Sequence, residues 1–223
     1  MKVSVVMITM NEELAIAKVV VDIRRVVPDA EIVVVDSSKD RTPEIAAELG
    51  CRVVRQFPPR GYGPAMDTAL RSATGDVVVT LDCDDTYPTD DIPAFVAAIE
   101  DGADLVNGNR IWRRPQAMPL ANFVANRTFG VVARLACGSK AMDLHSGMRA
   151  YRRTMLDALR WDPNGAALPV ELVLQPQRLG YRVVERPIEY RERLGQTTLH
   201  RWDSAKWTFR RMWKARRWRW GGA

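Results

Sequence analysis

Four short runs of continuous apolar residues, separated by helical patterns, constrain the fold of this chain more than any other feature. The runs lie at residues 3–8, 31–35, 52–54 and 76–81, and helical apolar spacing fills the intervals 14–27, 40–50 and 65–73. Strands without polar alternation are typical of a parallel sheet whose two faces are both covered by helices. The first 81 residues therefore predict an α/β fold with a mostly parallel sheet flanked by helices.

The rest of the chain continues this alternation less regularly. We expect helices at 92–101 and 170–180, and strands at 104–107, 149–151 and 183–190. The segment 117–137 is helical in pattern and partly apolar, but it is interrupted by Asn122, Asn126, Arg127 and Arg134. A membrane-spanning helix needs about 20 predominantly apolar residues. This segment therefore does not fit a conventional membrane span.

The formal net charge of +6 is concentrated near the C-terminus. Residues 201–219 carry eight Lys or Arg residues and one acid, which leaves the rest of the chain near −1. The three cysteines, Cys51, Cys83 and Cys137, are odd in number and lack the spacing of metal ligands, which argues against a disulfide framework and a zinc site. Because the N-terminus also shows no cleavable signal pattern, we expect a cytoplasmic protein.

Polar residues follow three of the predicted strands at the point where each strand ends. In strand order they are Asn11 and Glu12, then Asp36 and Ser38, then Asp82 and Asp84. Ligands of parallel α/β sheets bind at the carboxyl ends of the strands, so this edge is the candidate site. Turn formation explains Asp36 as well as nucleoside recognition does. Glu12 also has a structural explanation, because the helix dipole favours an acidic residue in the first turn of a helix.

The loop Asp82-Cys83-Asp84 carries the clearest chemistry. Two carboxylates at positions i and i+2 beyond a strand can approach one hard cation, and Mg²⁺ or Mn²⁺ with a bound diphosphate suits such oxygen ligands. The alternative is a solvated acidic turn that also includes Asp85. The position of the loop after a buried strand, beside two other polar strand ends, favours the metal site.

The order of the motifs resembles family 2 inverting glycosyltransferases of the GT-A fold. The matching segments are 8–12, 33–42, 60–65, 75–76, 82–84 and 87–88. Further segments resemble the dolichol-phosphate mannose synthase group, which includes polyprenyl-phosphate hexosyltransferases: 107–110, 145–151, 179–188 and 193–199. The resemblance covers roughly residues 1–199. Three positions depart from the family pattern, namely Val35, Thr86 and Thr198.

The resemblance implies roles at the matching positions. The implied catalytic residues are Asp82, Asp84, Arg110 and Arg193. Of these, Asp82 and Asp84 are also the implied metal ligands. The implied substrate-binding set is Thr9, Asn11, Glu12, Asp36, Ser38, Gly63, Asp82, Arg127, Ser146 and Arg149. Within that set, Arg127 is a candidate for an acceptor phosphate.

The resemblance also implies a reaction. A hexose, mannose or glucose, would move from a GDP- or UDP-linked donor to a polyprenyl phosphate, with Mg²⁺ or Mn²⁺ as cofactor. A lipid phosphate is already anionic and needs no strong base, whereas a hydroxyl acceptor would need one, for which Asp84, Asp85 and Asp143 are candidates. Soluble transfer to a hydroxyl is therefore one alternative. A non-catalytic nucleotide-sugar or membrane-binding module, suggested by Val35 and Thr198, is another.

Residues 200–223 form a basic, tryptophan-rich tail after the domain at 1–199. As a helix, the tail places aromatic and apolar residues on one face: Trp202, Phe209, Met212, Trp213 and Trp220. Its cations lie elsewhere on the wheel, at Arg210, Arg211, Lys214 and Arg217. This pattern predicts peripheral binding to the inner face of the cell membrane. The alternative is a helix that packs on the domain, and the tail lacks a module that would indicate nucleic-acid binding.

Overall fold

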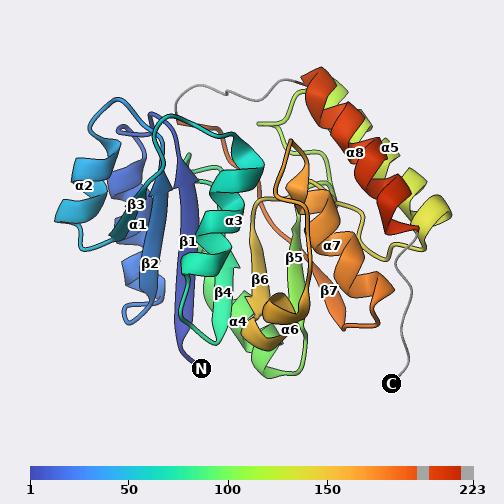
Figure 1. Cartoon of the computed structure of the whole chain (residues 1–223), viewed down its shortest axis with the longest axis horizontal. Helices are drawn as coiled ribbons and strands as arrows, with labels where there is room; N and C mark the ends of the chain where they lie inside the picture. The colour runs from blue at the N-terminus through green and yellow to red at the C-terminus, as the bar shows by residue number, and fades with distance from the viewer. Residues whose placement is uncertain (195–200, 217–223) are drawn as a thin grey trace.

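The computed structural model describes residues 1–194 and 201–216 and contains one seven-stranded sheet (Figure 1). The strand order is β3-β2-β1-β4-β6-β5-β7. The strands are β1 (Val3–Thr9), β2 (Glu31–Asp36), β3 (Arg52–Arg55), β4 (Val77–Thr80), β5 (Leu105–Asn109), β6 (Arg149–Arg152) and β7 (Val183–Pro187). Only β6 runs antiparallel to its neighbours, β4 and β5. The mostly parallel sheet expected from the sequence is confirmed.

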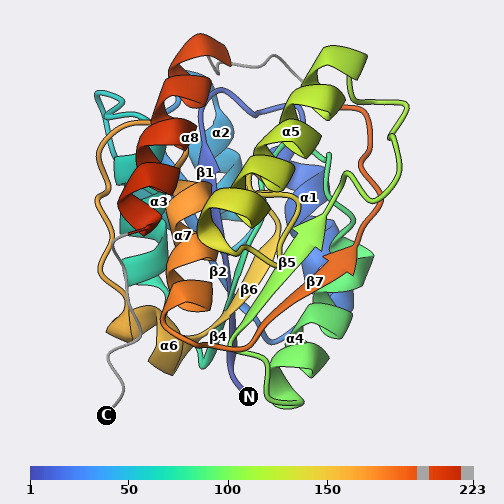
Figure 2. The ribbon, with the colours of Figure 1, turned by 90° about the vertical axis from the view of Figure 1, so that its right-hand side faces the viewer.

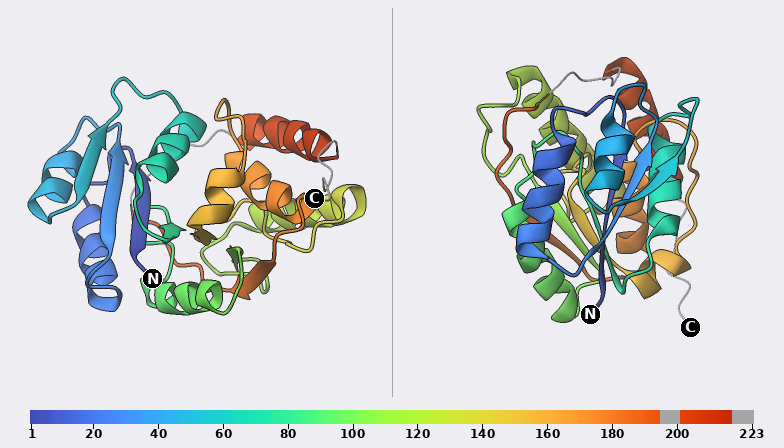
Figure 3. Two further views of the ribbon diagram at one scale, coloured as in Figure 1. Left: turned by 60° about the horizontal axis from the view of Figure 1, so that its bottom comes forward. Right: turned by 90° about the vertical axis from the view of Figure 1, so that its left-hand side faces the viewer.

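Helices cover both faces of this sheet, as Figure 3 shows. One face carries α1 (Ile16–Val26), α2 (Thr42–Glu48) and α4 (Ile92–Glu100), with the short turn η1 (Thr89–Asp91) before α4. The other face carries α3 (Tyr62–Ser72), α6 (Arg153–Ala158) and α7 (Leu168–Arg178). Successive residues of a strand point to opposite faces. Val34 therefore packs with the first group of helices, whereas Val33 and Val35 pack with the second.

The strand register brings the predicted polar loops together. Thr9 and Asp36, the last residues of β1 and β2, are directly paired. Thr80, the last residue of β4, pairs with Val6, so the chain beyond Thr80 continues beside the end of β1. Because β6 is antiparallel, its first residue, Arg149, pairs with Thr80, and the loop before β6 arrives at the same edge. The polar strand ends and this loop therefore meet at one place.

Two further helices, α5 (Leu120–Cys137) and α8 (Arg201–Ala215), lie side by side next to α7 (Figure 2). Along α8, the side chains of Thr208, Met212 and Ala215 are buried, whereas Phe209 and Trp213 are exposed. The expectation that Met212 lies on the outward aromatic face is wrong, because its side chain packs into the domain core. The described part of the tail therefore packs on the domain, while the division at residue 199 stays a prediction. Trp220 and Arg217 lie outside the described residues.

Arg211, expected among the cations that lie away from the aromatic face of the tail, is also buried. Its guanidinium pairs with the carboxylate of Glu171 on α7, which the Nζ of Lys214 also contacts at 3.0 Å. The same guanidinium donates hydrogen bonds to backbone carbonyls of the loop before α7, at Asp162 and Ala166. Within the described residues, no helix is long and apolar enough to cross a membrane.

We expect the substitution Arg211→Met to lower the free energy of unfolding by about 3 kcal/mol, because a buried carboxylate loses its main partner. Urea unfolding followed by circular dichroism measures this change. Arg210→Met is the matched control, since Arg210 is the exposed neighbour on α8, and its effect should stay within about 0.5 kcal/mol. Equal stability of the two variants would contradict a structural role of the buried pair.

Candidate functional site

A pocket of about 300 Å³ opens at the carboxyl edge of the sheet. Its walls come from the end of β1, the acidic loop after β4, the loop leading into α3, and Arg193 beyond β7. The lining residues are Ile8, Thr9, Met10, Glu12, Ser37, Pro59, Gly61, Tyr62, Ala65, Asp82, Cys83, Asp84 and Arg193. Five of the residues expected at the site, namely Thr9, Glu12, Asp82, Asp84 and Arg193, are therefore brought together by the fold.

Arg193 connects two acidic residues of this pocket. Its guanidinium lies 2.5 Å from Glu12 Oε1 and 2.8 Å from Asp84 Oδ2. The other oxygen of Asp84 accepts hydrogen bonds from the backbone N–H and the hydroxyl of Thr86, at 3.1 and 2.5 Å. Within the described part of the chain, Glu12 Oε2 and Arg193 Nε are buried without a hydrogen-bond partner. Buried polar atoms of this kind favour a bound ligand or water.

Two acidic side chains of the pocket, Asp82 and Glu12, resist ionisation. Burial, together with repulsion from Asp84, raises the pKa of Asp82 to about 7, although Arg110 and Arg193 oppose the shift. Burial also raises the pKa of Glu12 to about 7, against the attraction of Arg193 and with added repulsion from Asp84 and Asp82. The pocket therefore holds more potential negative charge than Arg193 neutralises, and a cation would be stabilised there.

The carboxylates of Asp82 and Asp84 fit a hard divalent cation. Among residues 1–194 and 201–216, nothing donates a hydrogen bond to the Asp82 carboxylate, which faces the pocket. Over the same residues, no group of three or more His, Cys, Asp or Glu side chains is arranged to hold a metal by itself. A cation held by this pair would take further ligands from substrate oxygens or water, as Mg²⁺ commonly does.

The loop before β6 lies directly against Asp82. A Cβ atom on Gly147 would come within 2.8–3.0 Å of the Asp82 carboxylate, so only glycine permits this approach without moving the carboxylate. The Gly147 N–H donates to the hydroxyl of Tyr87 at 2.8 Å, and its carbonyl accepts from Thr80 Oγ1 at 2.7 Å. These contacts fix Gly147, which the sequence analysis did not identify as part of the site.

Arg110 lies behind the pocket, where a buried carboxylate occupies its guanidinium. Its Nε and Nη2 donate to the two oxygens of Asp143 at 2.7 and 2.8 Å, and Asp143 has no exposed surface. Although burial opposes ionisation, the guanidinium holds the pKa of Asp143 below its usual value. Arg110 therefore acts on Asp82 at a distance, and Asp143 is unavailable as a base.

Asp36, Ser38 and Asn11 join the first two strand-end loops. Asp36 is fully buried and accepts hydrogen bonds from Thr9 Oγ1 at 2.7 Å and Ser38 Oγ at 2.6 Å, and it pairs with Arg55. Asn11 has a left-handed backbone with φ 62°, and its N–H donates to Ser38 Oγ at 2.8 Å. The neighbouring Ser37, rather than Asp36, reaches the pocket lining.

The remaining predicted residues lie outside the pocket lining. Gly63 packs against the backbone of residues 163–165. Ser146 and Arg149 are buried, and Arg149 donates hydrogen bonds to Asn107 Oδ1 and the Leu144 carbonyl. Arg127 lies on α5 beside a separate cavity. In contrast, Pro59, Gly61 and Tyr62 line the pocket, and the Pro- and Gly-rich composition of residues 58–64 is the signal that marks this loop in the sequence.

Comparison with known proteins identifies the fold and the family of the protein. The structure superposes on glucosyl-3-phosphoglycerate synthase from Mycobacterium tuberculosis with a TM-score of 0.77 and 23% identity, over 99% of this chain and 80% of the other. The architecture is accordingly the GT-A fold expected from the sequence. The family model of glycosyl transferase family 2 matches residues 4–160. The chain belongs to glycosyl transferase family 2, and it is a glycosyltransferase.

Two similar proteins carry more specific names. A dolichyl-phosphate hexose transferase from Haloferax volcanii is 46% identical over 197 residues, which cover 88% of this chain and 86% of that protein. A dolichol-phosphate mannosyltransferase from Pyrococcus furiosus is 30% identical over 202 residues, covering 85% of this chain and 56% of that protein. The expected membership of a group that includes these transferases is confirmed.

The raised pKa of Asp82 predicts a pH-dependent stability. Between about pH 4 and pH 7 the folded protein retains a proton that the unfolded chain releases, so stability falls as the pH rises through this window. Asp82→Asn removes the cost of ionisation. Without divalent cations, we expect this variant to melt at least about 3 °C above the parent protein at pH 8, with a smaller gain at pH 5.

Thermal unfolding in EDTA at the two pH values measures this difference. Asp85→Asn is the matched control, because Asp85 belongs to the same loop but pairs with Lys18 at 2.8 Å outside the pocket. The Asp85 variant should show no gain at pH 8. A gain for Asp82→Asn that is the same at both pH values would argue against an ionisation effect.

Proposed function

We propose that this enzyme transfers a hexose, mannose or glucose, from a GDP- or UDP-linked donor to a polyprenyl phosphate of the dolichyl type at a membrane surface. Inversion at the anomeric carbon follows from direct attack by the acceptor phosphate on the face opposite the leaving diphosphate. The observation that carries the proposal is the grouping of Asp82, Asp84 and Arg193 in one pocket at the carboxyl edge of the sheet. The names of the similar transferases support the lipid acceptor.

Mg²⁺ or Mn²⁺ would be held by Asp82 and Asp84, and when bound it would neutralise charge on the donor diphosphate. The protein's own residues orient the reaction. Thr86 holds one oxygen of Asp84 by hydrogen bonds, and Gly147 lies directly against the Asp82 carboxylate. Arg193 supplies a second positive charge at the place where negative charge grows on the leaving group.

Two of the three carboxylates expected as bases for a hydroxyl acceptor are occupied. Asp143 is fully buried and bound to Arg110, and Asp85 is paired with Lys18. The third, Asp84, lies in the donor pocket with Arg193 and is a proposed metal ligand. An acceptor phosphate carries its negative charge already, so transfer to it requires no side chain to remove a proton.

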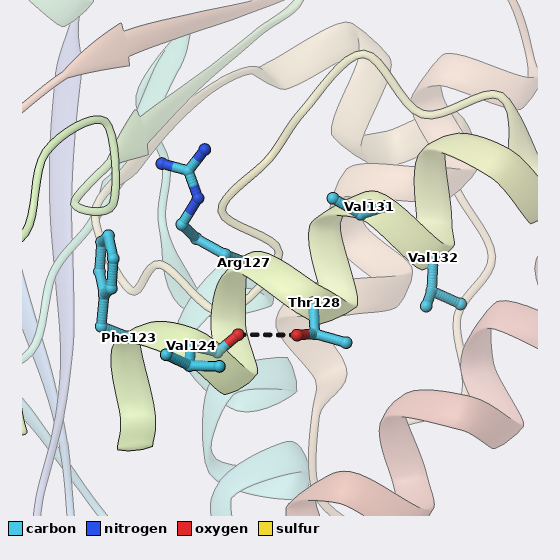
Figure 4. A pocket seen from close by; sticks show the side chains of 6 residues that line it. All are labelled: Phe123, Val124, Arg127, Thr128, Val131 and Val132. Atoms are coloured by element: carbon cyan, nitrogen blue, oxygen red, sulfur yellow. Dashed lines mark hydrogen bonds between the residues drawn. The ribbon is translucent and has the colours of Figure 1, made fainter. Parts of the chain in front are cut away.

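A second cavity, of about 310 Å³, suits the hydrocarbon part of such an acceptor. Figure 4 shows its lining on α5, with Phe123 and Arg127 toward one end of the row and Val131 and Val132 toward the other. The lining is almost entirely apolar, and the guanidinium of Arg127 is its single charged group. We place the isoprenoid chain along α5 and its phosphate near Arg127.

The outward surfaces of α5 and α8 suit a bilayer. Their exposed apolar side chains are Leu120, Val124, Val131, Leu135, Phe209 and Trp213. Exposed arginines accompany them on both helices, at Arg127, Arg134, Arg210 and Arg216. Apolar side chains that enter the headgroup region, together with cations that attract anionic lipids, are typical of peripheral membrane helices. We propose that this surface rests on the inner face of the cell membrane.

The transfer proposal is tested with radiolabelled UDP- and GDP-hexoses, polyprenyl phosphate in vesicles, and MnCl₂ or MgCl₂. We expect label to enter the lipid fraction with one of these donors, and Asp84→Ala to reduce the rate by at least about 100-fold, because electrostatic contacts to a leaving group contribute on this scale. Asp85→Asn should retain the parent rate. Full turnover by Asp84→Ala would overturn the role of the acidic pair, and absence of lipid labelling by the parent protein would overturn the acceptor assignment.

Membrane docking is tested by substitutions on α8, because removal of the whole tail would also remove the buried Arg211. The double variant Phe209→Ser/Trp213→Ser should bind vesicles of phosphatidylcholine and phosphatidylglycerol at least about tenfold more weakly, since two exposed apolar side chains no longer enter the bilayer. Co-sedimentation measures the bound fraction. Val21→Ser on α1 is the control, since Val21 is similarly exposed but lies on another helix. Equal binding of all variants would exclude this surface.

A further inference from the structure

A hydrogen bond connects α8 to the loop before β6. The ring of His145 lies with Nε2 2.8 Å from Thr208 Oγ1, and that hydroxyl also donates to the Ser204 carbonyl at 2.7 Å. Because the Thr208 hydroxyl donates to the Ser204 carbonyl, we assign the hydrogen of the histidine contact to His145 Nε2, which then donates to Thr208 Oγ1. Burial lowers the pKa of His145 to about 4, so the ring is neutral near pH 7 and keeps a single N–H.

Aromatic contacts enclose the same histidine. The ring of Phe129, on α5, lies 5.4 Å from the His145 ring and 5.5 Å from the ring of Phe209, on α8. His145 therefore occupies the junction between the two helices. Phe209 has more than half of its surface exposed on the outer side of this junction, whereas Thr208, the residue before it, has none exposed.

Two residues beyond His145, the same loop reaches the acidic pair. Gly147 lies against the Asp82 carboxylate, at a distance that would bring an added Cβ within 2.8–3.0 Å. The backbone N–H of His145 donates to Asp143 Oδ1 at 3.3 Å, which ties the start of the segment to the buried Arg110–Asp143 pair. Residues 145–147 thus connect α8 with the carboxylate proposed to bind the metal, and only Ser146 lies between His145 and Gly147 in the chain.

We infer that Thr208 and His145 are positioning residues for Asp82. Their hydrogen bond fixes the segment 145–147, and the segment in turn fixes the Asp82 carboxylate in the donor pocket. The inference rests on the proposed function for its catalytic consequence, but its structural part does not depend on the identity of donor or acceptor. It also makes α8 a shared element, with an outer face for the membrane and an inner face that supports the donor site.

The test compares Thr208→Val with Thr208→Ser in the full chain. Valine preserves the shape of the side chain and leaves the His145 N–H without an acceptor, whereas serine keeps the hydroxyl. We expect Thr208→Val to speed amide hydrogen exchange at Gly147 by roughly tenfold, as the loss of one hydrogen bond predicts. The Mn²⁺ concentration for half-maximal transfer should rise by a similar factor while the melting temperature changes by less than about 3 °C. Thr208→Ser should resemble the parent protein in all three measurements.

Other results overturn the inference or the proposed function separately. Unchanged exchange at Gly147 and an unchanged Mn²⁺ requirement in Thr208→Val would overturn the inference. In a second case, Thr208→Val loses activity only in proportion to the loss of folded protein, and its Mn²⁺ requirement is unchanged. Thr208 would then have a purely structural role, and this result would also overturn the inference. If the parent protein transfers no hexose to polyprenyl phosphate, the proposed function fails, and the exchange at Gly147 still decides whether Thr208 holds the loop.

Discussion

Among the residues that the structure describes, three carboxylates, Glu12, Asp82 and Asp84, share one partly buried pocket with one guanidinium, that of Arg193. This imbalance of charge underlies the chemistry of the site. Burial raises the pKa of Asp82 and of Glu12, and repulsion from the neighbouring Asp84 adds to both shifts. A divalent cation and a diphosphate would together bring in positive charge and oxygen ligands. The same electrostatics that cost stability in the free protein therefore favour binding of a metal-diphosphate complex.

The sheet topology makes this arrangement possible. Parallel strands bring the ends of β1, β2 and β4 to one edge, and the antiparallel strand β6 brings the end of its preceding loop to the same edge. Gly147 consequently meets Asp82 although the two residues are 65 positions apart in the sequence. Buried pairs behind the pocket, above all Arg110 with Asp143, hold this loop in place, so residues that do not line the pocket still determine its geometry.

The sequence predicts the parts of the site that depend on local patterns. Continuous apolar runs identify the parallel strands, and the positions directly after these strands identify Glu12, Asp82 and Asp84. Both signals are local in the sequence, so they can be recognised without information on distant contacts. The ion pair between Glu12 and Arg193 joins residues 181 positions apart, and no periodicity encodes it. The direction of β6 and the burial of Arg149 also depend on tertiary neighbours, since a four-residue strand carries too little pattern to fix either.

The tail shows why a helical wheel alone misplaces residues. The wheel separates aromatic from basic positions, but α8 has one face toward the domain and one face toward the outside. Arg211 points toward the domain because Glu171 on α7 is buried and needs a counter-charge. Met212 turns inward with it, and this leaves Phe209 and Trp213 on the outer surface. A helix whose inner face supports the site and whose outer face is apolar and basic cannot change its contact with a bilayer independently of the loop that it holds. In the proposed docking, membrane contact and donor-site geometry would therefore be linked through α8.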